Sequence, residues 1–483
     1  MTIGATLASF AARKPDATAI ICDDVVVTWS ALKEAVDAIV VDLENRCAPD
    51  ATVALVVRNS PIFAAFFLAC AVSGRAAAVI DAAWPSARIG DALETLHPSL
   101  LVADRAIDGI DAMIVDPRAQ LPSGAPPCEV RDIDPEAAFY VGFTSGSTGR
   151  PKGYRRSHRS WLASFEGDRI EFGMTEDDVV LVPGSMSHSL FLYALIHGLQ
   201  IGAAVLMSAA FHPVRALRMG RQHGATVAYA APTQWRMMIE ADQPSLPDLR
   251  WALSSGAKWF AGGATEISKI APSARFAEFY GASELSFVAV RKADEGCPDA
   301  SVGRSFSGVA ITIRNEDGAR LGPGEIGRVF VSSPYLFSGY VGDDGAIARH
   351  DGEMSVGDVG FLDEAGRLYL VGRGDRMIVS SGKNIFAEEI ESALECAPGI
   401  RAAAVFGAAD AVRGQAIVAL VLPEHGLSPR RDEVIRSLRE RLPVSFIPRV
   451  IAVPSEWRWT RSGKTDFSGM RAVWESGAWS KLA

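Results

Sequence analysis

The sequence predicts an α/β protein with a large N-terminal domain of parallel-rich βαβ sheets and a small α+β C-terminal domain. Short apolar runs alternate with helix-like segments over residues 53–241, which is typical of βαβ units with helices on both faces of a sheet. From about Val309 the runs are separated by Gly and Pro, which favours antiparallel strands and a small β-barrel-like part. After residue 376 a compact block of strand-like and helix-like segments follows.

The apolar pattern assigns the individual elements. In the N-terminal part we expect strands at 53–57, 76–80, 137–143, 179–182, 203–207 and 227–230, and helices at 61–71, 86–96, 190–199 and 234–241. Antiparallel strands are expected at 310–314 and 327–331. The last block predicts strands at 377–380, 402–406, 417–422 and 450–453, with helices at 387–396 and 431–442. We place the domain boundary at Asp375, which gives domains 1–374 and 375–483.

Composition excludes several classes of protein. The 483 residues are 48% hydrophobic, and 48 basic against 57 acidic residues give a net charge of −9, which disfavours nucleic acid or an anionic membrane as partner. The six cysteines are scattered, as expected of buried free thiols in a cytoplasmic protein rather than a disulfide or zinc framework. The most apolar stretch, Ile62 to Val72, is shorter than the about 20 residues of a membrane span, so we expect a core helix and no integral membrane segment.

The segment from Thr144 to Gly153 carries most of the functional information. It directly follows a strand-like run and contains four hydroxyl side chains and the ammonium group of Lys152. Two of its three glycines precede Pro151, and the third follows Lys152. Glycines let backbone N–H groups approach an anion closely, and hydroxyls and lysine add further donors. The order differs from the ordinary P-loop, because Pro151 interrupts it and Gly153 follows the lysine. The alternative, a surface Ser/Gly linker, does not account for the preceding strand.

This Thr-Ser-Gly-Ser-Thr-Gly-Arg-Pro-Lys-Gly order resembles the phosphate loop of the adenylate-forming superfamily, which includes acyl-CoA synthetases, adenylation domains and luciferases. Further segments resemble the family in the same order along the chain: Tyr280 to Glu284, Gly357 to Gly360, Gly372 to Asp375, the glycine segment around Gly382, and Thr460 to Lys464. Each segment alone is a weak signal. Together they are most similar to an acyl- or aryl-CoA synthetase.

The resemblance implies an ATP site and a set of reacting groups. The nucleotide-binding residues it implies are Thr144, Ser145, Gly146, Ser147, Thr148, Gly149, Lys152, Gly256, Ala257, Tyr280, Gly281, Ala282, Ser283, Asp358, Arg373 and Gly382. Thr144 and Glu284 would hold Mg²⁺ against the phosphates, and Asp358 with Arg373 would bind the ribose. Asp375 would be the hinge about which the C-terminal domain rotates.

The implied catalytic residues are Lys464, His188, Glu284 and Thr144. Lys464 would bridge the substrate carboxylate and the α-phosphate in the transition state, whereas a lysine in a surface tail is the alternative. His188 would form an aromatic gate to the thiol tunnel, although a lone histidine is more often a structural residue.

The chain departs from the family at three places near the hinge and the catalytic loop. Arg376 stands where a second Asp is common, Val379 where Lys is common, and Arg458-Trp459 replace Pro-Arg. The first two flank the hinge, so we expect no loss of chemistry. The third puts the rigidity of the loop before Lys464 in question.

The expected reaction joins a carboxylic acid to a thiol through acyl-AMP. No carboxylate occurs between Pro183 and Phe211, so a substrate ammonium would lack a counter-charge there and an amino acid is disfavoured. Apolar residues of this neighbourhood favour a hydrophobic or aromatic acid: Phe191, Tyr193, Trp235, Met238, Phe279 and Phe287. Coenzyme A is the expected acceptor, with a carrier protein as the alternative. An inactive nucleotide-binding regulator is a third hypothesis, which the presence of Lys464 and Glu284 disfavours. The sequence does not define the oligomeric state.

Overall fold

The computed structural model describes residues 1–128, 131–145, 151–241, 245–256, 259, 263–342, 347–380, 383–410, 414–460 and 463–482. Contacts divide the chain into two compact units. The first unit contains residues 1–311, 331–347 and 351–354, and the second contains residues 312–330, 348–350 and 355–483. This grouping does not follow a single cut in the chain, and the boundary at residue 375 stays a prediction.

The first unit contains a mostly parallel sheet in the order β18-β8-β7-β4-β3-β5-β6. Its strands are β3 (Thr52–Val56), β4 (Ala76–Val79), β5 (Leu100–Ala103), β6 (Met113–Ile114), β7 (Ala138–Ser145), β8 (Pro151–Ser157) and β18 (Gly339–Tyr340). Strands β3 to β7 pair in parallel, and β8 and β18 add antiparallel pairs at one edge. Strand β7 has buried side chains from Phe139 to Val141, which explains its apolar run.

The larger sheet of the first unit runs β2-β1-β10-β9-β11-β12-β13-β14-β15. Its strands are β1 (Thr18–Cys22), β2 (Val25–Thr28), β9 (Val179–Val182), β10 (Ala204–Met207), β11 (Val227–Ala230), β12 (Trp251–Ser255), β13 (Arg275–Ala282), β14 (Ser286–Lys292) and β15 (Gly303–Ser305). Pairing is parallel from β1 to β13 and antiparallel at β2, β14 and β15. The carboxyl ends of the central strands therefore meet at one edge, where ligand sites form in such sheets.

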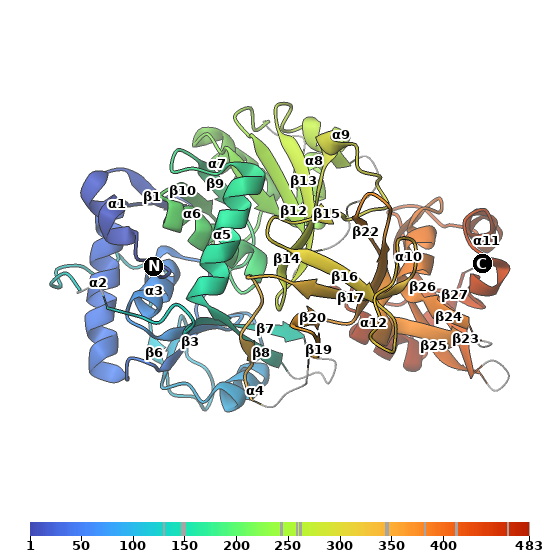
Figure 1. Cartoon of the computed structure of the whole chain (residues 1–483), viewed down its shortest axis with the longest axis horizontal. Helices are drawn as coiled ribbons and strands as arrows, with labels where there is room; N and C mark the ends of the chain where they lie inside the picture. The colour runs from blue at the N-terminus through green and yellow to red at the C-terminus, as the bar shows by residue number, and fades with distance from the viewer. Residues whose placement is uncertain are drawn as a thin grey trace. The chain divides into compact units, whose positions relative to one another are not determined.

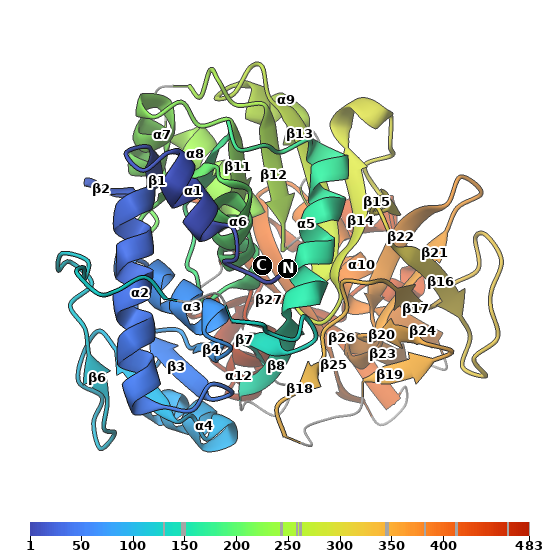
Figure 2. The ribbon, with the colours of Figure 1, turned by 60° about the vertical axis from the view of Figure 1, so that its left-hand side comes forward.

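Helices cover both sheets. They are α1 (Leu7–Arg13), α2 (Trp29–Arg46), α3 (Pro61–Val72), α4 (Ser86–Leu96), α5 (His158–Phe172), α6 (Ser189–Ile201), α7 (Pro213–Gln222), α8 (Pro232–Glu240) and α9 (Gly263–Ser268), with a 3₁₀ turn η1 (Ala293–Glu295). Figure 1 shows β3 and β7 in one layer and β9, β12 and β13 in the other, and α5 crosses from the first layer to the second; Figure 2 shows the same crossing from another side. Helices α7, α8 and α9 contribute to a separate core on one face of the larger sheet.

The second unit combines antiparallel strands with an α+β block. The antiparallel strands are β16 (Ala310–Arg314), β17 (Gly327–Ser332), β19 (Ala348–His350), β20 (Glu353–Ser355), β21 (Asp358–Leu362) and β22 (Arg367–Arg373), some of which extend into the first unit. The block contains η2 (Gly374–Arg376), β23 (Met377–Ser380), β24 (Lys383–Phe386), α10 (Ala387–Glu395), β25 (Ile400–Asp410), β26 (Gly414–Pro423), α11 (Arg431–Arg439), η3 (Val444–Phe446), β27 (Val450–Pro454), α12 (Phe467–Glu475) and β28 (Trp479–Lys481). Its sheet runs β24-β23-β26-β27-β28, with β25 paired to β26.

The predicted α/β class is confirmed, and most predicted elements lie within two residues of their predicted bounds. The stretch Ile62 to Val72 forms the buried helix α3, as predicted. The final predicted helix, 431–442, is too long, because α11 ends at Arg439. Within the described residues no helix is long and apolar enough to cross a membrane.

The prediction that all six cysteines are buried is wrong. All are free thiols, but only two are buried: Cys22 and Cys70 are buried, Cys47, Cys128 and Cys297 are half-buried, and Cys396 is exposed. Burial raises the pKa of the Cys22 thiol to about 12. An exposed cysteine does not interrupt the apolar periodicity, so the sequence pattern did not distinguish it from a core residue.

Candidate active site

The hairpin of β7 and β8 frames the predicted phosphate loop. Thr144 pairs across the hairpin with Lys152, so the hydroxyl and the ammonium stem start from neighbouring positions. Gly146, Ser147, Thr148 and Gly149 lie outside the described residues, as does the side chain of Ser145. The described residues therefore establish the two strands that hold the loop and the pairing of Thr144 with Lys152.

Tyr340 of β18 links this hairpin to Glu284. The Nζ atom of Lys152 lies 5.4 Å from the centroid of the Tyr340 ring, a cation–π distance. The Tyr340 hydroxyl donates a hydrogen bond of 2.9 Å to Oε1 of Glu284. Among the described residues, Oε2 of Glu284 has no hydrogen-bond partner. One aromatic side chain thus connects two of the predicted ligand-binding groups and leaves a carboxylate oxygen available.

Glu284 sits in the turn between β13 and β14, and a buried arginine anchors that turn. Arg156 donates 2.9 and 2.6 Å hydrogen bonds to the backbone carbonyls of Ser283 and Tyr335. The carbonyl of Glu284 accepts a hydrogen bond of 2.8 Å from the backbone N–H of Phe337. Burial lowers the pKa of Arg156 to about 10, so it stays protonated at neutral pH. The turn therefore has a fixed backbone around a buried carboxylate.

The predicted nucleotide segment Tyr280 to Ser283 ends β13 at the carboxyl edge of the larger sheet. A Cβ atom on Gly281 would lie 2.1 Å from the backbone oxygen of Ser286, so only glycine fits there. Ser255 pairs with Phe279, which places Gly256, at φ +95°, next to Tyr280 on the adjacent strand. Ala257 lies outside the described residues. The register brings these predicted residues together at one edge of the sheet.

His188 immediately precedes α6, and Asn59 holds the loop that leads to it. The Asn59 side chain donates to the carbonyls of Gly184 and Ser208 at 2.8 and 2.9 Å. It also accepts a 2.9 Å hydrogen bond from the backbone N–H of Met186. The ring of His188 lies 6.5 Å from that of Phe191 in an edge-to-face arrangement. A buried amide therefore fixes the backbone beside the predicted gate.

In the second unit, Asp358 and Arg373 form a pair on adjacent antiparallel strands. They are register partners on β21 and β22, and Nε of Arg373 lies 3.1 Å from Oδ1 of Asp358. The carboxylate is buried whereas the guanidinium is largely exposed. The backbone N–H of Gly374 donates to the carbonyl of Gly357 at 3.0 Å and closes this end of the strands. Asp375 follows in η2, and its side chain lies outside the described part of the chain.

Lys464 ends a tight turn that begins at Thr460. The Thr460 N–H donates to the Lys464 carbonyl at 2.7 Å, and the Lys464 N–H donates to Oγ1 of Thr460 at 3.1 Å. Trp459 and Thr465 form a bridge at the base of this turn. Desolvation of the ammonium group and the nearby positive charge of Arg373 both lower the pKa of Lys464. Thr460 and Lys464 are therefore held together by hydrogen bonds, directly after Arg458-Trp459.

Comparison with known proteins decides the family. The family model described as AMP-binding enzyme matches residues 7–341, and the model described as AMP-binding enzyme C-terminal domain matches residues 389–464. The chain belongs to the AMP-binding enzyme family. The prediction of an ATP-dependent, adenylate-forming acyl-CoA ligase is confirmed at the level of the family.

Relatives of this AMP-binding enzyme are known by name. It is 36% identical over 430 residues to YhfT, an uncharacterised acyl-CoA ligase of Bacillus subtilis (strain 168), covering 87% of this chain and 88% of that protein. It is 31% identical over 335 residues to a putative long chain fatty acid-CoA ligase, VraA, of Staphylococcus epidermidis, and the match covers 69% of this chain and 71% of that protein. The crystal structure of ATP-bound MatB from Rhodopseudomonas palustris has a TM-score of 0.88 at 22% identity, covering 99% of this chain and all of that one, and so has the same fold.

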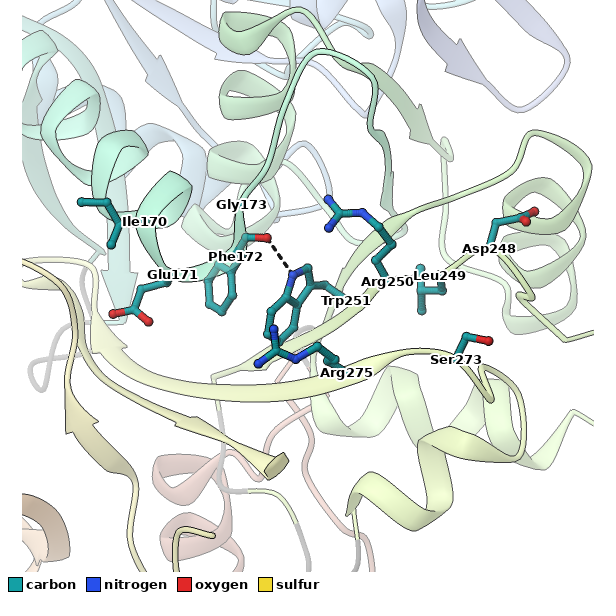
Figure 3. A pocket seen from close by; sticks show the side chains of 10 residues that line it. All are labelled: Ile170, Glu171, Phe172, Gly173, Asp248, Leu249, Arg250, Trp251, Ser273 and Arg275. Atoms are coloured by element: carbon teal, nitrogen blue, oxygen red, sulfur yellow. Dashed lines mark hydrogen bonds between the residues drawn. The ribbon is translucent and has the colours of Figure 1, made fainter. Parts of the chain in front are cut away.

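A pocket of about 490 Å³ in this AMP-binding enzyme lies elsewhere, between the end of α5 and the residues at the amino ends of β12 and β13 (Figure 3). Its arginines are already paired, Arg250 with Asp178 at 2.8 Å and Arg275 with Asp294 at 2.6 Å. Tyr280 lies at the opposite, carboxyl end of β13. The pocket is therefore separate from the candidate active site.

Sequence reasoning missed three residues that organise the site of the AMP-binding enzyme: Tyr340, Arg156 and Asn59. Tyr340 follows Ser338-Gly339 in a turn-like segment that carries no helix or strand pattern. Arg156 follows another arginine in β8, and only the alternation of the strand indicates which of the two points inward. Gly382 lies outside the described residues. The described residues form no group of three or more His, Cys, Asp or Glu side chains that could hold a metal ion.

Proposed function

We propose that this enzyme activates a hydrophobic or aromatic carboxylic acid as acyl-AMP and then transfers the acyl group to coenzyme A, through rotation of its C-terminal domain about Asp375. The observation that carries the proposal is the connection of Lys152, Tyr340 and Glu284 beside the strands that hold the phosphate loop. These groups offer one cation and one free carboxylate oxygen next to a segment rich in phosphate donors. Free thiols throughout are in keeping with a cytoplasmic location.

In the proposed first step a substrate carboxylate oxygen attacks the α-phosphorus of ATP, and the bond to pyrophosphate breaks. Lys152 and the hydroxyl of Thr144 bind the phosphates, while Asp358 and Arg373 bind the ribose hydroxyls. Lys464 donates hydrogen bonds to the negative charge that develops between the carboxylate and the phosphate. Magnesium, when bound, neutralises phosphate charge, and Glu284 with Thr144 supplies oxygen donors of the kind it prefers.

In the proposed second step a coenzyme A thiolate attacks the acyl carbon, and AMP leaves. His188 stands at the start of α6, held by the loop that Asn59 anchors, in the position we propose for a gate to the thiol. Rotation about Asp375 would exchange the Lys464 turn for the segment around Gly382. The names of the relatives, which are acyl-CoA ligases, support coenzyme A as the acceptor.

Among the residues that the structure describes, the proposed acid pocket is aromatic. Tyr193 lies 5.1 Å from Phe287, and Phe287 lies 4.7 Å from Phe279, as ring-centroid distances. Asp168 on α5 is buried nearby. Its Oδ2 accepts a hydrogen bond of 2.8 Å from Tyr229 and lies 3.1 Å from Nδ1 of His197, whereas its Oδ1 has no hydrogen-bond partner in the described part of the chain. The long chain fatty acid named for VraA is in keeping with an apolar acid.

Two residues that we assigned to this neighbourhood lie elsewhere. Trp235 and Met238 belong to the core beneath α7, α8 and α9, on one face of the larger sheet. The indole N–H of Trp235 donates to the carbonyl of Leu253 at 3.3 Å. The proposed acid pocket therefore rests on the residues of α6, β13 and β14.

The test is acid-dependent release of pyrophosphate with a panel of fatty, aryl, dicarboxylic and amino acids, each with and without coenzyme A. We expect release with the fatty or aryl class, and acyl-CoA only when coenzyme A is present. Pyrophosphate release without an acyl-CoA product would replace coenzyme A by a carrier-protein thiol. Preference for an amino acid would overturn the substrate class, and absence of release with every acid would overturn the ligase proposal.

A further inference from the structure

We propose that Arg376 is a positioning residue that holds the pair Asp358–Arg373 and the Lys464 turn in one fixed arrangement. The proposal rests on the proposed function, because it assigns the ribose to the first of these groups and adenylation to the second. Arg376 directly follows the predicted hinge, Asp375. All of its described contacts lie within the second unit.

The guanidinium of Arg376 is shared between two carboxylates of α10. It lies 2.5 and 3.2 Å from the two carboxylate oxygens of Glu391, and 3.0 Å from Oε1 of Glu388. Glu391 also accepts a 2.7 Å hydrogen bond from the backbone N–H of Val405. A planar guanidinium can satisfy two carboxylates at once because its donors point in several directions, which an ammonium group cannot match.

Glu388 extends this network to the ribose pair. Its Oε1 accepts a long hydrogen bond of 3.4 Å from the backbone N–H of Arg373, the residue paired with Asp358. A Cβ atom on Gly372 would lie 2.4 Å from Oε2 of Glu388, so the carboxylate and this strand end are in close contact. By holding Glu388, Arg376 therefore fixes the backbone from which the Arg373 side chain projects.

On its other side Arg376 reaches the element that carries Lys464. The centre of its guanidinium lies 3.6 Å from the centroid of the Phe467 ring, the first residue of α12. Asp466 caps this helix by accepting a 3.0 Å hydrogen bond from the Gly469 N–H, and its own N–H donates to the carbonyl of Arg458. The Lys464 turn is thus tied to the helix start on which Arg376 stacks.

The two carboxylates make a cation necessary at this position. Burial raises the pKa of Glu391, and the adjacent Arg376 opposes that rise. A neutral side chain at 376 would leave Glu388 and Glu391 facing each other without a cation, so the Glu388 contact to Arg373 would weaken as well. The Asp358–Arg373 pair and the Lys464 turn would then lose their common support.

The experiment measures AMP affinity by calorimetry and the kcat of adenylation by pyrophosphate exchange. The variants separate the contact of Arg376 with Glu388 from its contact with Phe467. Arg376→Met should weaken AMP binding and lower kcat, each about tenfold. Phe467→Leu should lower kcat severalfold and leave AMP affinity within twofold. Glu388→Gln should weaken AMP affinity severalfold and leave kcat within twofold. Arg376→Lys should recover part of the loss, because it keeps the charge. Arg430→Met, at an exposed arginine that pairs with Asp432, is the matched control.

A double-mutant cycle tests whether Arg376 acts through Lys464. If it does, Arg376→Met should change the residual kcat of Lys464→Ala by less than twofold. A further tenfold loss of kcat in the double variant would assign Arg376 a general stabilising role and overturn the proposal. The same conclusion would follow if Phe467→Leu and Glu388→Gln both changed kcat and AMP affinity in parallel. If no acid supports adenylation, the ligase proposal fails. AMP binding then decides, because an unchanged affinity in Arg376→Met would overturn the present inference as well.

Discussion

The two units hold their candidate binding residues by different means. In the first unit, buried side chains anchor the backbone: Arg156 and Asn59 each bond to carbonyls of distant loops. In the second unit, partly exposed ion pairs hold the backbone. The Arg373 side chain is 55% exposed, and Arg376 forms ion pairs with two carboxylates. Buried hydrogen bonds resist salt and pH, whereas exposed pairs are weak and adjustable. The difference is in keeping with the proposed function, in which the phosphate site stays fixed and the C-terminal part changes its contacts during the reaction.

The largest effect should follow from removing the buried anchor. Arg156→Met leaves two carbonyls without their partner and should lower the free energy of unfolding by about 3 kcal/mol. Its neighbour Arg155, exposed on the same strand, provides the matched control Arg155→Met, which should change stability by less than about 0.5 kcal/mol. Urea unfolding measures both variants. Equal losses would show that the first unit is not held by this buried contact.

A comparable effect on rate should come from the residue of the second unit that we propose as catalytic. Lys464→Ala should lower acyl-AMP formation about 100-fold, equivalent to about 2.7 kcal/mol, because charge in the transition state loses its donor. Thioester formation from synthetic acyl-AMP should be retained. Lys481→Ala, at an exposed lysine of the same unit, is the control. Equal loss of both half-reactions would refute the assignment of Lys464 to the first step alone.

A smaller effect should follow in the first unit when the free carboxylate oxygen is replaced. Glu284→Gln should raise the magnesium concentration needed for half-maximal pyrophosphate release about tenfold, because an amide is a weaker ligand than a carboxylate. Tyr340→Phe keeps the carboxylate and removes only its hydroxyl donor, so its magnesium dependence should shift less. An unaltered dependence in Glu284→Gln would remove Glu284 from the proposed metal site.

The smallest effect should be a pH dependence confined to the second unit. Burial raises the pKa of Glu391 to about 7 in the folded protein, and Arg376 and Glu388 are the charged groups that face it. A raised pKa favours folding at low pH, so this contribution is complete below about pH 4.5 and is lost as pH rises towards 7. Between pH 4.5 and 7 the free energy of unfolding, measured in urea, should fall less in Glu391→Gln than in the unchanged protein, by on the order of 1 kcal/mol. Parallel curves for the two proteins would contradict the assignment.

The sequence by itself determined the local features of this protein. Apolar periodicity located strands such as β4 and helices such as α4, because buried faces repeat every two or about 3.6 residues. The Thr144 to Gly153 segment and the ordered motifs after it indicated a nucleotide-binding ligase, because phosphate recognition requires those residue types close together in the chain. The family match bears out that reading.

Only the tertiary structure decided which distant residues support these motifs. Tyr340 meets Glu284 across 56 positions, Asn59 meets Gly184 across 125, and Arg156 meets Tyr335 across 179. Residues 312–330 group with the C-terminal part of the chain, although residues 331–347 between them belong to the first unit. Such contacts leave no periodic trace, because a single tyrosine, asparagine or arginine looks the same in sequence whether it faces water or a buried carbonyl. Their partners are set by how strands and helices pack in three dimensions.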